Sequence, residues 1–201
     1  MTMWIFGYGS LLWYTDFPYE TAVPGIVRGF SRRFWQLSPD HRGTPEKPGR
    51  TVTLVPDQEG SCWGLAYKVS DGHVGETVEY LNHREKAGYI LRNVVFHPDD
   101  GSCPFTLSVY LASAGDNPYF TGPTDNGLIV NTILMSHGPS GSNLEYALKL
   151  ADCVRRMAPF VKDDHLFTIE KKLIELCREK GIHDKVLDEL GYCDTHRDLE
   201  N

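Results

Sequence analysis

The sequence lacks the residue patterns that hold disulfide-rich and metal-dependent proteins together. Its five cysteines are an odd number, none forms a C-x-x-C pair, and neighbouring cysteines lie at least 16 positions apart. Its eight histidines show no H-E-x-x-H or H-x-H spacing. We therefore predict a reduced cytosolic (cytoplasmic) protein without a disulfide framework, a zinc module or another metal site.

Long apolar runs and an excess of positive charge are also absent. No segment approaches the roughly 20 apolar residues of a membrane span, and the first residues lack a basic region followed by a cleavage site. The formal net charge is −7. A charge of this sign argues against general binding to nucleic acids or to membrane surfaces.

The remaining composition suits one folded domain. The chain has 201 residues, of which 41% are hydrophobic and 11% are aromatic, enough for a substantial core. Residues 181–201 are polar and charged, so we expect a domain over residues 1–180 and a loosely ordered C-terminal tail over 181–201.

Strand patterns dominate the first half of the chain and helical patterns the second, which indicates an α+β fold. We expect strands at 3–6, 22–37, 51–55, 61–69, 89–97 and 105–113, with a hairpin turn at 57–60. Helices are expected at 71–86, 125–136, 143–157 and 164–180. Both faces of segment 22–37 mix polar and apolar residues, which favours a barrel or a bent sheet.

The first strand runs into a glycine-bracketed tyrosine, Gly7-Tyr8-Gly9-Ser10. Two glycines permit positive φ angles and a close approach to the main chain, whose N–H groups can converge on an anion. An isolated G-x-G also occurs in ordinary tight turns. It is not a dinucleotide fingerprint, because Leu12 stands where a third glycine is needed.

One carboxylate falls on an apolar helix face. At about 100° per residue, Val74, Val78, Leu81 and Glu85 share one side of the helix expected at 71–86, whereas Glu76 and Glu79 project to the opposite side. Burial and the end of the helix dipole would both raise the pKa of Glu85, as suits a proton-transferring group. Alternatively, Glu85 pairs with a buried arginine or turns outward.

The basic residues are concentrated in one part of the chain. Between residues 28 and 50 there are six basic and two acidic side chains, a net charge of +4 that suits a small anionic ligand or simply a solvated loop. The Gly/Ser-rich segment 137–142 precedes a helix N-terminus that could hold a carboxylate or phosphate, although such segments are often only turns. Tyr146, one turn into that helix, is a candidate contact or a packing residue.

Six motifs in order give this chain a family resemblance. They are Phe6-Gly7-Tyr8-Gly9-Ser10-Leu11, Arg32-Arg33-Phe34-Trp35-Gln36, Asp40-His41-Arg42-Gly43, Pro48-Gly49-Arg50-Thr51-Val52-Thr53-Leu54, Arg84-Glu85-Lys86 and Gly138-Pro139-Ser140-Gly141. From about Met3 to about Leu176 the sequence resembles the ChaC family of glutathione-specific γ-glutamylcyclotransferases, in its short form. His83 departs from the aromatic residue that relatives tend to carry there.

The resemblance implies a γ-glutamylcyclotransferase-like mixed β-barrel with flanking helices. It implies that Glu85 is the catalytic acid/base and that the segment Ile5, Phe6, Gly7, Tyr8, Gly9, Ser10 and Leu11 lines the substrate pocket. Weaker candidate contacts are Arg33, Arg42, Arg50, Glu76 and Tyr146. The substrate would be glutathione, with no cofactor, metal, nucleic acid, membrane or obligate protein partner.

The implied reaction is an intramolecular aminolysis of glutathione to 5-oxoproline and cysteinylglycine. The substrate brings its own amine nucleophile, so one carboxylate that moves a proton suffices. Two alternatives stay open. The chain acts on another γ-glutamyl amine, or it binds glutathione or a γ-glutamyl metabolite without catalysis.

Overall fold

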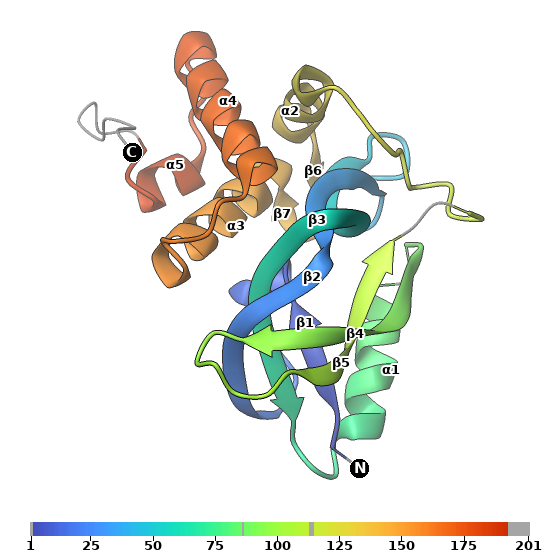
Figure 1. Ribbon diagram of the computed structural model, residues 1–201. Coiled ribbons are helices and arrows are strands. Elements are labelled where there is room, and N and C mark those ends of the chain that lie inside the picture. The colour runs from blue at the N-terminus through green and yellow to red at the C-terminus, as the bar shows by residue number, and fades with distance from the viewer. Residues whose placement is uncertain (1, 86, 113–114, 193–201) are drawn as a thin grey trace.

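The computed structural model describes residues 2–85, 87–112 and 115–192. Five strands form a closed barrel in the order β1-β3-β2-β4-β5 (Figure 1). The strands are β1 (Trp4–Gly7), β2 (Tyr19–Ser38), β3 (Gly49–Val69), β4 (Tyr89–Pro98) and β5 (Phe105–Ala112). Their neighbours are antiparallel except for β1 and β5, which meet in parallel at Ile5 and Ser108. The predicted α+β barrel is confirmed.

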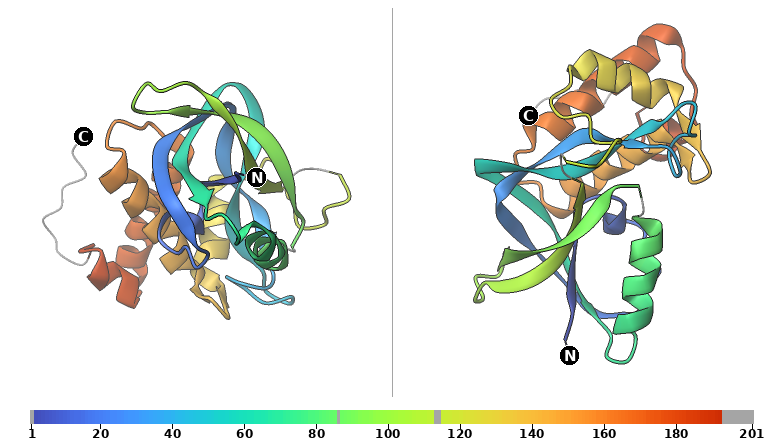
Figure 2. Two further views of the ribbon diagram at one scale, coloured as in Figure 1. Left: turned by 90° about the horizontal axis from the view of Figure 1, so that it is seen from below. Right: turned by 90° about the vertical axis from the view of Figure 1, so that its right-hand side faces the viewer.

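The helices lie in two places around this barrel. Figure 1 and Figure 2 show α2–α5 gathered at one end, while α1 lies along the strands at the other. The helices are α1 (Val74–Arg84), α2 (Asn126–Met135), α3 (Asn143–Met157), α4 (Asp164–Lys180) and α5 (Lys185–Glu189), with a short 3-10 helix η1 (Ser10–Leu12) and a two-stranded sheet of β6 (His137–Gly138) and β7 (Gly141–Ser142). None of the described helices combines the length and apolar character needed to cross a bilayer.

Capping side chains fix the helix starts that the sequence predicted. The Asp125 side chain accepts from the N–H groups of Gly127 and Leu128 at the start of α2, and Ser142 accepts from Glu145 at the start of α3. Such contacts satisfy main-chain donors that have no partner within the helix. The start of α1 differs from expectation, because the helix begins at Val74, after its N-cap His73, and not at residue 71.

The expected hairpin turn at residues 57–60 is wrong. β3 continues through these residues, and both of its halves pair with β2 instead of with each other. The register shifts between Arg28 and Phe30, where Gly29 has a φ of 80° that favours glycine. This irregularity bends the two long strands together and helps to close the barrel.

Two apolar clusters hold the elements in place. The larger joins barrel residues such as Phe34 and Trp63 to helix residues such as Leu148 and Ile169. The smaller packs Leu81 of α1 against Ile5 and other barrel residues. The second cluster fixes the C-terminal end of α1, and therefore Glu85, against the barrel.

The segment after Gly181 is more ordered than we predicted. It contains α5, in which Val186 and Leu187 are buried in the larger cluster, so a loose tail is the wrong description of residues 181–192. The periodic apolar pattern of this segment is too short to reveal a helix from sequence. Residues 193–201 lie outside the described residues, and a domain boundary near residue 180 stays a prediction.

The burial of α5 can be tested by substitution. Leu187 is 5% exposed, so we expect Leu187→Ala to lower the free energy of unfolding by about 2–4 kcal/mol, the usual cost of truncating a buried leucine. Leu128, which is 57% exposed, is the matched control, and Leu128→Ala should cost under about 0.5 kcal/mol. Urea denaturation of both variants decides the matter, and equal costs would contradict the docking of α5.

Candidate active site

A small pocket opens where β1, α1 and α3 converge. Its volume is about 50 Å³. Its lining comes from the β1–η1 segment, β3, the C-cap of α1, β4, β5 and α3, and consists of Phe6, Tyr8, Gly9, Ser10, Leu11, Val52, Glu85, Tyr89, Tyr110 and Tyr146. Residues far apart in the sequence thus surround one carboxylate among the described residues, and we call this space the inner pocket.

The glycines beside Tyr8 are needed for close packing. Contrary to expectation, neither has a positive φ, and that of Gly9 is −125°. A Cβ at Gly7 would lie 2.8 Å from the Cβ of Leu11, too close for any side chain. A Cβ at Gly9 would lie 3.1 Å from the Tyr146 hydroxyl, so glycine keeps the inner pocket open there.

Glu85 stands directly after the last turn of α1. It is the C-cap residue, and its N–H donates to the carbonyl of Leu81 at 2.8 Å. Its side chain is 20% exposed. Burial raises the pKa of this carboxyl above its ordinary value, against the opposing effects of Arg84 and His41. The direction matches the sequence prediction, although α1 ends at Arg84, two residues before the expected end of the helix.

Four tyrosines with neutral hydroxyls line the inner pocket, namely Tyr8, Tyr89, Tyr110 and Tyr146. Burial and the nearby Glu85 raise the pKa of Tyr8 well above its ordinary value, and the same causes raise that of Tyr110 to about 12. Tyr8 donates to the carbonyl of Tyr110 at 2.7 Å, and Tyr89 donates to that of Val52 at 2.7 Å. Tyr146 accepts from the N–H of Val52 at 3.2 Å, which leaves its own proton for a ligand.

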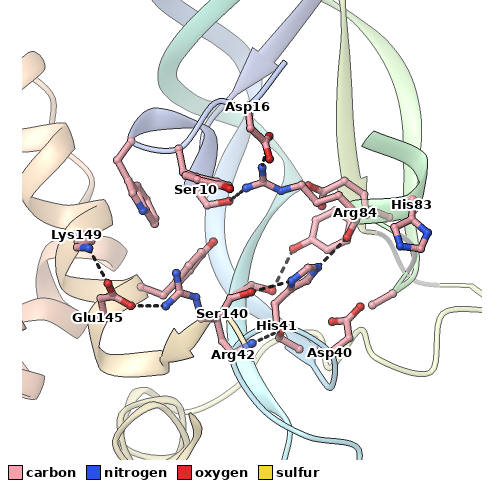
Figure 3. A pocket seen from close by; sticks show the side chains of 18 of the residues that line it. Ser10, Asp16, Asp40, His41, Arg42, His83, Arg84, Ser140, Glu145 and Lys149 are labelled. Atoms are coloured by element: carbon pink, nitrogen blue, oxygen red, sulfur yellow. Dashed lines mark hydrogen bonds and ion pairs between the residues drawn. The ribbon is translucent and has the colours of Figure 1, made fainter. Parts of the chain in front are cut away.

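Arg84 joins three segments of the chain beside the inner pocket. Its guanidinium donates to the hydroxyl of Ser10 at 2.6 Å and lies 3.5 Å from the carboxylate of Asp16 (Figure 3). Its main-chain carbonyl lies 3.0 Å from Nε2 of His41, so this ring nitrogen carries the proton of the hydrogen bond. One residue therefore fixes the η1 segment, the end of α1 and the loop that carries His41.

A larger cleft continues outward from the inner pocket. It has a volume of about 590 Å³, within the usual range for small-molecule sites, and it shares Ser10, Glu85, Tyr89 and Tyr146 with the inner pocket. We call it the outer cleft. His83 lines it and is exposed.

One wall of the outer cleft carries a group of three charges. Arg42 donates to Glu145 at 2.7 Å, and Lys149 donates to the other oxygen of that carboxylate at 2.6 Å. The Arg42 guanidinium also lies over the Tyr146 ring, 5.6 Å from its centroid. This arrangement places positive charge on the α3 side of the cleft (Figure 3).

The structure brings only some of the predicted residues together. The segment from Phe6 to Leu11, without Gly7, lines the inner pocket, and Arg42 and Tyr146 line the outer cleft. Ile5 and Gly7 pack behind the lining and are buried. The three remaining candidates, Arg33, Arg50 and Glu76, lie outside both cavities.

Each of these three has another environment. Arg33 lies 4.0 Å from Asp57 and lines a separate hollow with Trp35. Arg50 donates to the Thr121 hydroxyl at 2.8 Å. The Glu76 side chain is 82% exposed and lies beside His73, as the helix periodicity predicted for its face.

Sequence reasoning missed Arg84, Tyr89, Tyr110 and Lys149 as parts of the site. Arg84 stood inside a quoted motif, so a signal existed for it. Lys149 follows Glu145 at the i, i+4 spacing of an ion pair, but no pattern in the sequence shows which face of α3 lines the cleft. Within the described ranges, no group of three or more His, Cys, Asp or Glu residues is arranged to hold a metal ion.

A family model described as ChaC-like protein matches residues 3–176. The chain belongs to the ChaC family. This ChaC chain is 46% identical over 170 residues to mouse glutathione-specific γ-glutamylcyclotransferase 1, an alignment that covers 83% of this chain and 76% of the mouse protein. It is 33% identical over 187 residues to the glutathione-specific γ-glutamylcyclotransferase of Schizosaccharomyces pombe, covering 86% and 92% of the two chains.

The fold agrees with a solved relative. A crystal structure of the γ-glutamyl cyclotransferase specific to glutathione from yeast superposes with a TM-score of 0.81 at 32% identity. The match covers 87% of this ChaC chain and 96% of the yeast chain. The described barrel and helices are thus those of the γ-glutamylcyclotransferase fold.

The raised pKa of Glu85 predicts a pH-dependent stability in this ChaC protein. Above that pKa the folded state holds an ionised, largely buried carboxylate that the unfolded chain ionises more easily, so ionisation costs stability. Glu85→Gln should therefore be more stable than wild type at pH 8. This advantage should shrink as the pH falls through the raised value toward the ordinary 4.5.

Chemical denaturation at a series of pH values measures this difference. Glu79→Gln, which changes an exposed carboxylate of the same helix, is the control and should alter the unfolding free energy by under about 0.5 kcal/mol throughout. A Glu85→Gln variant that is less stable than wild type at pH 8 would show that the carboxylate is stabilised rather than strained.

Proposed function

We propose that this chain is a glutathione-specific γ-glutamylcyclotransferase that cleaves reduced glutathione into 5-oxoproline and cysteinylglycine. One observation carries the proposal: Glu85, with its raised pKa, borders the same inner pocket as Gly9 and Tyr146. Membership of the ChaC family and the names of the curated relatives support it. The cytosolic location predicted from the cysteine pattern stays a prediction.

The reaction joins the two ends of the γ-glutamyl group. The α-amine attacks the γ-carbonyl carbon, a new C–N bond closes the five-membered lactam, and the amide bond to cysteine breaks. The α-ammonium must lose one proton before it attacks, and the attacking nitrogen loses a second as the lactam forms. The departing cysteine nitrogen gains one proton as the amide bond breaks and then a second to become an ammonium. Glu85 takes a proton from the attacking nitrogen and delivers it to the departing nitrogen, a task that suits a carboxyl whose pKa lies above its ordinary value.

The remaining lining of the inner pocket orients the substrate. The main-chain N–H groups at the start of η1 have no partner within that short helix, so those of Gly9 and Ser10 are suited to a carboxylate or to the developing oxyanion. The Tyr146 hydroxyl, which accepts from Val52, can donate its own proton to the same group. Holding the substrate folded removes much of the entropic barrier to ring closure.

The proton transfer predicts the effect of an amide at this position. Glu85→Gln should lower kcat for 5-oxoproline release by about 100- to 10,000-fold, because glutamine has nearly the same shape but cannot accept the proton. Glutathione binding, measured by calorimetry, should change by less than about threefold, since the proton is moved only during the reaction. Glu79→Gln is again the control and should retain wild-type turnover; a Glu85→Gln variant with more than a tenth of that turnover would rule out the role.

A comparison of substrates separates the alternatives. We expect 5-oxoproline from glutathione at a kcat/KM at least about tenfold above that from γ-glutamyl-alanine, because the cleft beyond the inner pocket has room for the cysteinylglycine part. A reversed preference would indicate a cyclotransferase for another γ-glutamyl amine. Binding of glutathione with no turnover of any γ-glutamyl compound would favour the non-catalytic binder.

A further inference from the structure

Among the described residues, three cationic side chains line the outer cleft, and they differ in the number of protein groups that they already contact. Arg84 holds Ser10 and Asp16. Arg42 donates to the carbonyl of Ser142 at 3.1 Å as well as to Glu145, and its side chain is 10% exposed. Protein groups therefore already hold both arginines in place.

Of these three cations, Lys149 has the most donors left for a ligand. Its ammonium carries three protons, and its hydrogen bond within the described residues goes to Glu145. The side chain is 29% exposed and lines the outer cleft. An ammonium with unused donors on the wall of a cleft is suited to a ligand carboxylate.

Glu145 holds Lys149 and Arg42 side by side. Burial opposes ionisation of Glu145, but the hydrogen bonds from Lys149 and Arg42 outweigh it and lower the pKa of this carboxyl. Glu145 therefore stays charged at neutral pH and fixes the two cations on either side of it. Together the three side chains carry a net positive charge, which can attract an anion.

The position of these charges corresponds to the far end of a peptide substrate. When the γ-glutamyl group occupies the inner pocket beside Glu85, the rest of the substrate must extend into the outer cleft, since the two spaces share Tyr146. Lys149 follows Tyr146 by three residues on the same helix, α3. Figure 3 shows Lys149 and Glu145 on the side of the cleft opposite to Arg84 and His83.

We propose that Lys149, positioned by Glu145 beside Arg42, binds the terminal glycyl carboxylate and makes this chain selective for γ-glutamyl peptides that end in a free carboxylate. This inference rests on the proposed function, because it takes the γ-glutamyl end to lie beside Glu85. It assigns to α3 the recognition of the substrate's far end.

The test combines a protein change with a substrate change. The protein change is Lys149→Met, and the substrate change replaces glutathione by its C-terminal amide, which lacks the glycyl charge. For glutathione, Lys149→Met should lower kcat/KM about tenfold, mainly through KM, because a charge-assisted hydrogen bond is lost. For the amide, wild type and Lys149→Met should have kcat/KM values within about twofold of each other.

Two further variants make the result specific. Lys149→Arg keeps the charge and should restore most of the affinity for glutathione. Lys172→Met, which removes an exposed lysine of α4 outside both cavities, should match wild type with both substrates. The proposal is overturned if wild type turns over the amide as efficiently as glutathione, or if Lys149→Met slows both substrates equally.

A failure of the proposed function would look different. Wild type would then release no 5-oxoproline from either substrate. Calorimetric binding of glutathione and its amide to wild type and to Lys149→Met would still decide the role of Lys149. A tenfold preference of wild type for glutathione that Lys149→Met abolishes supports the carboxylate site, and equal binding of both compounds refutes it.

Discussion

The contact between Arg84 and Ser10 holds the proposed site together. The two residues are 74 positions apart in the sequence, and their side chains meet at 2.6 Å. The Arg84 side chain is only 12% exposed, so its pairing with Asp16 is screened less than a surface ion pair would be. Because Glu85 is the next residue, the same contact sets the position of the carboxylate relative to the η1 segment, and His41 fixes the main chain at that point.

The environment of Glu85 is poor for stability and suited to proton transfer. The Glu85 carboxylate is 20% exposed, lies among tyrosines that stay neutral and is 3.7 Å from the Arg84 guanidinium. Despite this cation, burial makes it ionise less easily than a carboxylate in water. The surrounding clusters must supply that energy, which is the usual relation between a strained site and the fold that carries it. The nearby Arg84 and His41 oppose part of the rise in pKa that burial causes, and a carboxyl with a raised pKa is suited to both taking and releasing a proton.

The sequence predicted those structural features whose physical cause lies in residues that are neighbours along the chain. The starts of α2 and α3 follow from Asp125 and Ser142, whose side chains cap the helices they precede. The predicted turn at residues 57–60 was wrong. Both halves of β3 pair with β2, and this long-range pairing overrides the local turn signal. The resemblance identified Glu85, whereas periodicity alone left it open between a site residue and an ion pair.

The errors among the arginines have the same origin. A basic segment in the sequence does not form a basic surface, because side chains alternate between the two faces of a strand. Arg33 and Arg50, on β2 and β3, contact Asp57 and Thr121, whereas Arg42 in the intervening loop reaches α3. Glu145, its partner there, is 103 positions away, a proximity that only the tertiary fold creates.

Helix α3 explains how the two ends of the cleft keep their spacing. It carries Tyr146 at the inner pocket and Lys149 at the outer wall, so their separation is set by one rigid element. Its first residue, Asn143, accepts from the N–H of Arg50 at 2.6 Å and donates to the carbonyl of the same residue at 2.7 Å, which locks the helix to β3. The Ser142 hydroxyl donates to Asp184 at 3.0 Å. Asp184 also caps α5, so the segment that the sequence suggested was loose supports the helix on which substrate recognition depends.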